Sequence, residues 1–209
     1  MFKRVLSTIV LGLALMMNQA CSAEGFEEGV HYQTLTKPVV TSDPARVEVL
    51  ELFWYGCPHC DMLDPALKAW AQQLPSDVLF TRMPVVFGRS WEMHARMFWV
   101  AKNLGLLDTI HGPLFDKIHR EGRRLQRVED VIAFFERYGA DPAVVKRELA
   151  GFATESALRL ADARVRAYGI QGVPALVVNG QFVTGVSQAG GESQLFQLLD
   201  ELIEKSRQK

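Results

Sequence analysis

The sequence predicts an α/β fold in which an all-helical segment interrupts a single domain. An apolar run at residues 47–55 is typical of a buried strand, and the motif Cys57-Pro58-His59-Cys60 and a helical pattern follow it. Helical patterns then fill residues 90–168, after which a strand hairpin and a last helix return. Because the hairpin follows the helices, we expect the helices to be inserted into the domain and not to form a module at one end.

The first half of the predicted sheet lies on either side of the cysteine motif. A short strand at residues 31–35 precedes the longer strand at residues 46–55 that leads into the motif. The helix after the motif contains Pro65, which should kink it because proline removes one backbone hydrogen bond. Residues 77–83 predict another strand, which Pro84 should end.

Capping residues divide the helical segment into separate helices. Ser90 is suited to cap the first of them, and residues 128–138 form an amphipathic helix further along. Asp141, followed directly by a proline, predicts an N-cap with proline in the first turn. The last helix of the segment should end at Gly169, a residue type that favours helix C-termini.

The strand signals that return after this point complete the domain. Residues 174–179 and 181–184 read as two strands joined by Asn179-Gly180, a dipeptide typical of a tight hairpin turn. The final helix should bury one apolar face, made of Leu195, Leu198, Leu199, Leu202 and Ile203.

Length and charge fit this organisation. The chain has 209 residues and a formal net charge of -1, which suits one globular domain with an insertion. We predict an α/β domain built from residues 24–88 and 169–209, with an inserted helical domain at residues 89–168. The near-neutral charge gives no reason to expect a nucleic-acid partner.

The start of the chain predicts a secretory signal peptide at residues 1–23. A short basic start precedes an apolar stretch at residues 5–17, which is too short to span a bilayer comfortably. The small residues Cys21 and Ala23 fit a cleavage site, so the mature chain should begin near Glu24. Secretion places the mature protein in an oxidising compartment.

A lipoprotein anchor is the alternative interpretation of this segment. It would attach a lipid to Cys21 after cleavage behind Ala20. Such signals usually carry leucine three residues before the cysteine, where this chain has Asn18. We favour the soluble form, in which cleavage removes Cys21 and leaves only the two cysteines of the motif.

The motif Cys57-Pro58-His59-Cys60 predicts redox chemistry. Proline is favoured at the first position of a helix, so Pro58 places Cys57 at a helix N-terminus. There the unpaired N–H groups and the helix dipole stabilise a thiolate, and a protonated His59 adds a second positive charge. Because a lower pKa of Cys57 stabilises the reduced form, the disulfide form becomes an oxidant.

A structural zinc site is the alternative use of two such cysteines. Zinc usually needs four ligands, so a second pair of cysteines or histidines would be required. The chain has no second cysteine pair, and its remaining histidines show no ligand spacing: His31, His94, His111 and His119. We therefore expect no metal at the motif.

The whole mature chain resembles the DsbA family of bacterial periplasmic thiol:disulfide interchange proteins. The resemblance rests on the Cys-Pro-His-Cys motif after a strand, the helical block, Gly172-Val173-Pro174 before a hairpin, and the secretory signal. It implies a thioredoxin fold with an inserted helical domain. A depressed cysteine pKa and an oxidising disulfide are known properties of the family.

The resemblance also implies roles for individual residues. Cys57 matches the accessible sulfur that substrates attack, and Cys60 matches its buried partner. Val173-Pro174 matches a loop with a cis proline that faces the disulfide. The exposed backbone of Val173 would pair with an extended substrate and hold its cysteine beside Cys57.

Glu51 matches a family acid near the buried cysteine. A carboxylate within a buried strand is costly without a partner, so we expect Glu51 to relay a proton to or from Cys60, with Arg82 as its ion-pair partner. The alternative is a plain ion pair, or a position in water at the end of the sheet. His59, between the two cysteines, has a simpler alternative as an exposed helix residue.

The function implied by the resemblance is that of a periplasmic dithiol oxidase. The Cys57–Cys60 disulfide would pass to unfolded exported proteins with cysteine pairs through a mixed disulfide. A membrane partner resembling DsbB would reoxidise the protein, which would act as a monomer without any bound cofactor. The alternatives are a disulfide reductase or isomerase of the same fold, and a non-redox peptide-binding chaperone.

Overall fold

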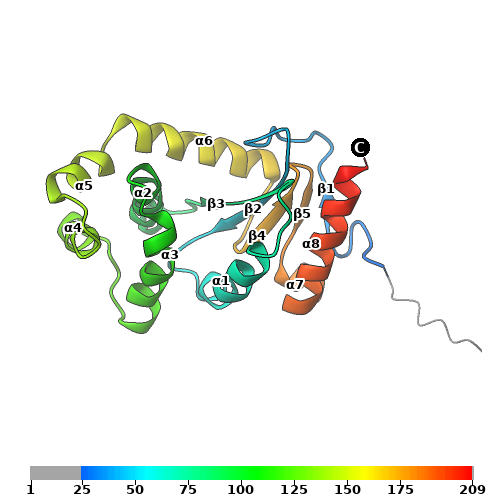
Figure 1. Cartoon of the computed structure of the whole chain (residues 1–209), viewed down its shortest axis with the longest axis horizontal. Helices are drawn as coiled ribbons and strands as arrows, with labels where there is room; N and C mark the ends of the chain where they lie inside the picture. The colour runs from blue at the N-terminus through cyan, green and yellow to red at the C-terminus, as the bar shows by residue number, and fades with distance from the viewer. Residues whose placement is uncertain (1–24, 209) are drawn as a thin grey trace, which may run out of the picture.

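The computed structural model describes residues 25–208, which form a central sheet with helices on both faces. Figure 1 shows α2 to α5 gathered at one end of the molecule, while α6 runs back along the sheet. The predicted signal peptide, with Cys21, lies outside the described residues. Within residues 25–208, no helix is both long and apolar enough to cross a membrane.

The sheet contains five strands in the order β1-β5-β4-β2-β3. Their bounds are Gln33–Thr34 for β1, Val47–Phe53 for β2, Val78–Pro84 for β3, Ala175–Val178 for β4 and Phe182–Thr184 for β5. Strand β2 runs parallel to β3 and antiparallel to β4. The predicted hairpin between β4 and β5 is confirmed, and Asn179 and Gly180 both have positive φ, at 51° and 63°.

The helices between β3 and β4 form the inserted block. They are α2 (Arg89–Asn103), α3 (Leu107–Phe115), the π-helix η1 (Asp116–Arg120), α4 (Val128–Glu136), α5 (Pro142–Leu149) and α6 (Phe152–Tyr168). The remaining helices are α1 (Pro58–Ala71), α7 (Val186–Ala189) and α8 (Glu192–Arg207). The predicted α/β fold with a helical insertion is therefore confirmed.

One of the predicted element ends needs correction. Ser90 does not cap α2, because the helix already begins at Arg89 with Gly88 in the N-cap position. β3 ends at Pro84, as predicted, and the proline is itself the last residue of the strand, which is possible because β3 lies at the edge of the sheet. The predicted N-cap Asp141 is confirmed, and its side chain accepts two backbone hydrogen bonds.

Helices cover the two faces of the sheet with different clusters of apolar side chains. On one face Val49 shares a buried cluster with Leu67 of α1 and Leu199 of α8. On the other face Leu50 shares a buried cluster with Val165 of α6. Successive side chains of β2 point to opposite faces, so this single strand contributes to both layers of the core.

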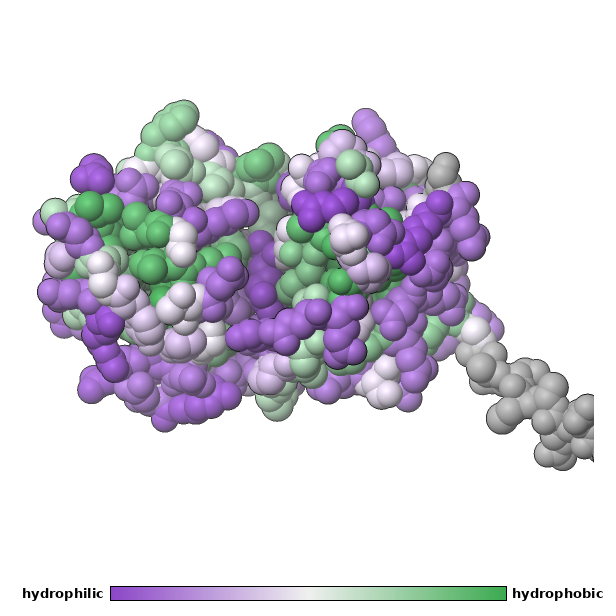
Figure 2. Space-filling model, in the orientation of Figure 1, coloured by the Kyte–Doolittle hydropathy of each residue, from purple (hydrophilic) through white to green (hydrophobic). Residues whose placement is uncertain are grey.

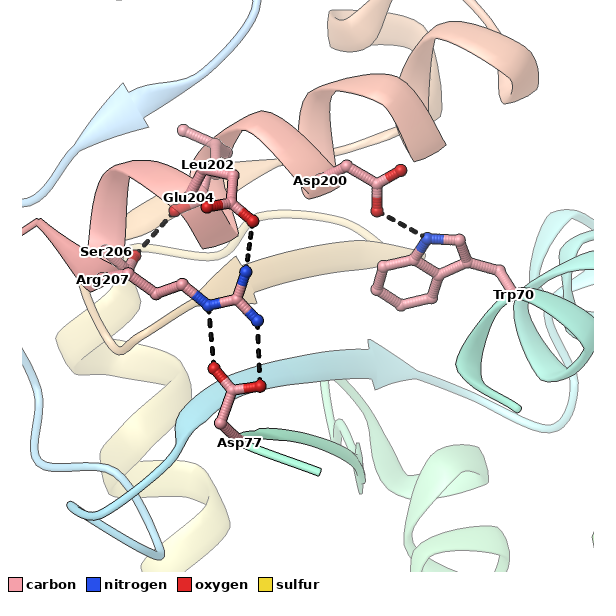
Figure 3. A network of polar contacts seen from close by, with 7 residues as sticks. All are labelled: Trp70, Asp77, Asp200, Leu202, Glu204, Ser206 and Arg207. Carbon is pink, nitrogen blue, oxygen red and sulfur yellow. Dashed lines mark hydrogen bonds and ion pairs between the residues drawn. The ribbon is translucent and has the colours of Figure 1, made fainter. Parts of the chain in front are cut away.

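The final helix α8 is fastened to the sheet by polar contacts as well as by apolar burial. Its predicted apolar face is confirmed: Leu195, Leu198, Leu199, Leu202 and Ile203 are all buried. Figure 3 shows Trp70 of α1 donating a hydrogen bond to Asp200, at 2.9 Å, and Arg207 reaching Asp77 with two nitrogens. These contacts join α8 to α1 and to the start of β3.

Candidate active site

The two cysteines lie at the start of α1, as the motif predicts. Cys57 is the N-cap residue, Pro58 occupies the first turn, and the Cys57 sulfur accepts a hydrogen bond from the backbone N–H of Cys60 at 3.4 Å. Both cysteines are free thiols. Cys57 retains 7% of its surface and Cys60 none, so only Cys57 can be approached from outside.

The surroundings of the two thiols drive their pKa values apart. Hydrogen bonds from Cys60 and from the backbone N–H of His59 lower the pKa of Cys57 to about 6, against the opposing effect of burial. The exposed His59 adds a smaller electrostatic contribution in the same direction. Burial raises the pKa of Cys60, and the neighbouring Cys57 raises it further. Cys57 is therefore the thiol that carries negative charge near neutral pH.

A loop from the far end of the sequence meets Cys57. The Val173–Pro174 peptide bond is cis, and the Cys57 sulfur lies 3.5 Å from the carbonyl oxygen of Val173. A groove of about 600 Å³ opens beside this contact, lined in part by His59, Met62, Val173 and Pro174. An extended peptide in this groove would pass next to the Cys57 sulfur.

The loop before Cys57 is held by the inserted helices. Trp54 stacks on Trp91 of α2 with ring centroids 4.1 Å apart and an angle of 8° between the rings. The Tyr55 hydroxyl lies 2.8 Å from His111 Nδ1 of α3. A side chain on the intervening Gly56 would meet the Trp54 ring at 2.3 Å, so glycine is required there.

Glu51 is fully buried on β2 and pairs with Arg82 of the neighbouring strand. The two residues are register partners in the sheet, and Arg82 Nε donates to Glu51 Oε2 at 2.9 Å. The predicted partner is therefore confirmed, and the alternative of a water-exposed glutamate at the sheet end is wrong. Burial raises the pKa of Glu51 to about 7, because desolvation outweighs the attraction of Arg82.

Asp64 and His111 complete a polar cluster that the sequence analysis did not identify. Arg82 Nη2 donates to Asp64 Oδ1 at 3.0 Å, and His111 Nε2 lies 3.2 Å from the same oxygen. Burial opposes ionisation of Asp64, but His111 and Arg82 hold its pKa below the usual value. A signal for Asp64 was present, since it follows Cys60 by four residues and lies on the same face of α1.

The alternative zinc site and the histidines considered for it can be compared with the structure. Within residues 25–208, no group of three or more histidine, cysteine, aspartate or glutamate side chains is placed to hold a metal ion. His94 and His119, from the set considered for zinc, each contact a backbone carbonyl oxygen, of Arg124 and Tyr55 respectively.

Known proteins are similar to this chain in both sequence and fold. The sequence profile of the DSBA-like thioredoxin domain family matches residues 59–202. The thiol:disulfide interchange protein DsbA of Pseudomonas aeruginosa is 35% identical over 205 residues, which cover 98% of this chain and 97% of that protein. The DsbA of Azotobacter vinelandii is 35% identical over 211 residues, covering 99% of each. A crystal structure of Pseudomonas aeruginosa DsbA has a TM-score of 0.84 at 37% identity, and the match covers 88% of this chain and 96% of that chain.

Proposed function

The chain belongs to the DSBA-like thioredoxin domain family and is a thiol:disulfide oxidoreductase, and from this premise we propose how its residues oxidise substrate proteins. It acts as a protein dithiol oxidase. The oxidant is a disulfide between Cys57 and Cys60, which is exchanged with substrate thiols, and no bound cofactor takes part. The main support for this function is the position of Cys57. It lies at the start of α1, where its pKa is low, and beside Val173 at the groove, where substrates can reach its sulfur.

Oxidation of a substrate proceeds in two exchanges. A substrate thiolate attacks the Cys57 sulfur, the bond to Cys60 breaks, and Cys60 leaves with the electron pair and takes up a proton. A second substrate thiolate then attacks the substrate sulfur of the mixed disulfide and releases Cys57 as a thiolate. Because Cys57 has a pKa of about 6, it is a good leaving group in this second exchange.

The other predicted site residues assist these exchanges. The Val173 backbone pairs with the substrate chain, and Pro174 lines the groove beside it. His59 stabilises the Cys57 thiolate electrostatically. Glu51 supplies and removes the proton of Cys60, which its pKa of about 7 suits near neutral pH.

The start of the chain and its family support a cellular location and partners for the reaction. After removal of residues 1–23, the protein works as a monomer in the periplasm on unfolded exported proteins that carry cysteine pairs. A membrane protein resembling DsbB accepts the two electrons and restores the disulfide. The basic and apolar start of the sequence and the resemblance to a periplasmic family support this setting.

The redox equilibrium of the mature protein with glutathione tests the direction of the reaction. Trp54, which is half-buried close to Cys57 in the chain, should report the redox state by its fluorescence. We expect a reduction potential well above that of thioredoxin, and loss of protein oxidation in Cys57→Ser. A potential near that of thioredoxin would instead point to a reductase, and full activity in Cys57→Ser would point to a non-redox chaperone.

A further inference from the structure

Four ionisable side chains form a continuous buried cluster beneath the cysteines. Arg82 contacts two carboxylates at once, Glu51 through Nε and Asp64 through Nη2, at 2.9 and 3.0 Å. The second Glu51 oxygen, Oε1, has no hydrogen-bond partner within residues 25–208. One arginine thus serves two carboxylates, and the cluster lacks one positive charge whenever both are ionised.

His111 occupies the far end of this cluster, next to Asp64. Its Nε2 lies 3.2 Å from Asp64 Oδ1, and its Nδ1 lies 2.8 Å from the Tyr55 hydroxyl. Burial raises the pKa of Tyr55, so the hydroxyl keeps its proton and donates to Nδ1. His111 Nε2 then carries the ring hydrogen and lies 3.2 Å from Asp64 Oδ1 without the alignment of a hydrogen bond, while burial lowers the pKa of His111 and favours the neutral ring.

A second cavity brings solvent to this end of the cluster. It has a volume of about 470 Å³ and lies between α1, β3 and α3, with Asp64, Arg82 and His111 in its wall and Lys68 and Asp108 beside them. Figure 2 shows a hollow near the middle of the face where these three elements meet. None of the residues lining this cavity lines the groove beside Cys57, so a substrate in the groove leaves the cavity open.

We propose that His111 is a positioning residue in the oxidase cycle, which sets the protonation of Glu51 through Asp64 and Arg82 and connects it to solvent in the cavity. The inference rests on the proposed role of Glu51. With the His111 ring 3.2 Å from Asp64, Arg82 remains available to Glu51, and Glu51 can release its proton. Without His111, Asp64 draws Arg82 more strongly and Glu51 retains the proton.

The cavity matters because the groove is covered at the moment when a proton moves. Cys60 gains a proton when the substrate thiolate breaks the Cys57–Cys60 bond. It loses that proton when it attacks Cys57 during reoxidation and displaces the thiolate of the oxidant. In both steps another protein lies over Cys57, so the proton must reach or leave Cys60 from behind.

Stopped-flow oxidation of the reduced protein by the aromatic disulfide dithiobis(nitrobenzoate) separates the two cysteines. In the first phase Cys57 thiolate attacks the reagent and releases one coloured thiolate. In the second phase Cys60 loses its proton, attacks the Cys57 sulfur of the mixed disulfide, and releases the second coloured thiolate. Both rates are followed between about pH 5 and pH 8, a range that brackets the Glu51 pKa of about 7.

His111→Gln is the decisive variant, because glutamine fills the site and can bond to Tyr55 but cannot take a proton beside Asp64. We expect the first phase to keep its rate, and the second to slow about tenfold near neutral pH with its midpoint moved upward. His94→Gln is the matched control, since His94 is an equally buried histidine that contacts the Arg124 carbonyl oxygen and not the cluster. Its second-phase midpoint should equal that of the wild type.

Glu51→Gln distinguishes failure of this inference from failure of the proposed function. A slow second phase in Glu51→Gln together with a wild-type profile in His111→Gln would overturn the inference and leave the role of Glu51 intact. Equal slowing of both phases in His111→Gln would also overturn it, because His111 would then act by holding the Tyr55 loop. If Glu51→Gln itself has a wild-type second phase, both the role of Glu51 and the inference fail.

Discussion

Strand β2 carries two buried glutamates, Glu48 and Glu51, that face opposite sides of the sheet. Glu48 is 1% exposed and accepts hydrogen bonds from Ser42, Thr81 and Arg164 of α6. Glu51 is fully buried, but within residues 25–208 its one side-chain donor is Arg82, which also donates to Asp64. The two sites thus combine the same residue type and the same depth with different numbers of partners.

The number of hydrogen-bond donors distinguishes a structural buried carboxylate from a reactive one. Glu48, with three donors, has its carboxylate oxygens bonded and ties α6 to the sheet. Glu51 has too few donors to offset its desolvation, so its pKa rises to about 7 and a proton can move on or off it. The under-satisfied glutamate is the one nearer to the cysteines in the chain.

The largest expected effect concerns Arg164, the cation that pairs with Glu48. Arg164→Ala would leave Glu48 buried without its positive partner, which should cost about 3–5 kcal/mol of unfolding free energy. Urea denaturation at neutral pH measures this loss. Arg166→Ala, which removes an exposed ion pair with Asp162 on the same helix, should cost less than about 1 kcal/mol. A loss of less than about 1 kcal/mol in Arg164→Ala as well would show that Glu48 needs no cation.

The next effect concerns the pH dependence contributed by Glu51. Since its pKa is raised from 4.5 to about 7 in the folded state, Glu51 favours folding fully at low pH and loses that contribution as the pH rises through about 7. The shift corresponds to about 3 kcal/mol. The unfolding free energy of Glu51→Gln, relative to that of the wild type, should therefore rise by up to about 3 kcal/mol from pH 4 to pH 8. Unfolding measured at several pH values tests this rise.

A matched variant on the opposite face sharpens this test. Glu48→Gln removes the anion from Arg164 and should lose stability at neutral pH, opposite in sign to Glu51→Gln. A stability difference between Glu51→Gln and the wild type that stays constant with pH would mean that Glu51 does not change its protonation on folding.

The smallest effect concerns the titration of Cys57. The thiolate absorbance of the wild type should have its midpoint at about pH 6. Because Glu51 and Cys57 interact electrostatically, Glu51→Gln should lower that midpoint by about a few tenths of a pH unit. Glu48→Gln should leave it unchanged, since Glu48 faces α6 on the other side of the sheet. A higher Cys57 midpoint in Glu51→Gln, or the same shift in both variants, would contradict the difference between the two glutamates.

The contrast between these glutamates was only partly predictable. The sequence predicts that Glu51 lies in a buried strand and that Arg82 on the next strand can reach it, because parallel neighbours align in register. Glu48 stands in the same strand, but its cation lies in α6, 116 residues further along the chain. No local pattern indicates which distant helix will cover a given face of a strand.

The inserted helices were predictable as helices but not in their contacts with the site. Capping and periodicity predict where α5 and α6 begin or end, since those signals act within one or two turns. The stacking of Trp91 on Trp54 and the contact of His111 with Asp64 depend on how the helical block packs against the loop before Cys57. That packing is set by many weak apolar contacts at once, so single residues do not reveal it.

The chemistry of the motif can be derived from the sequence alone, because the proline that starts α1 fixes Cys57 at the helix end, and the dipole and N–H groups there act over a few ångströms. The surroundings of the Cys57 sulfur depend on the tertiary structure. It brought Val173 to Cys57, shared Arg82 between two carboxylates, and placed His111 beside Asp64 at a cavity. Capping is a local interaction, whereas desolvation and charge sharing depend on which distant segments exclude water from the site.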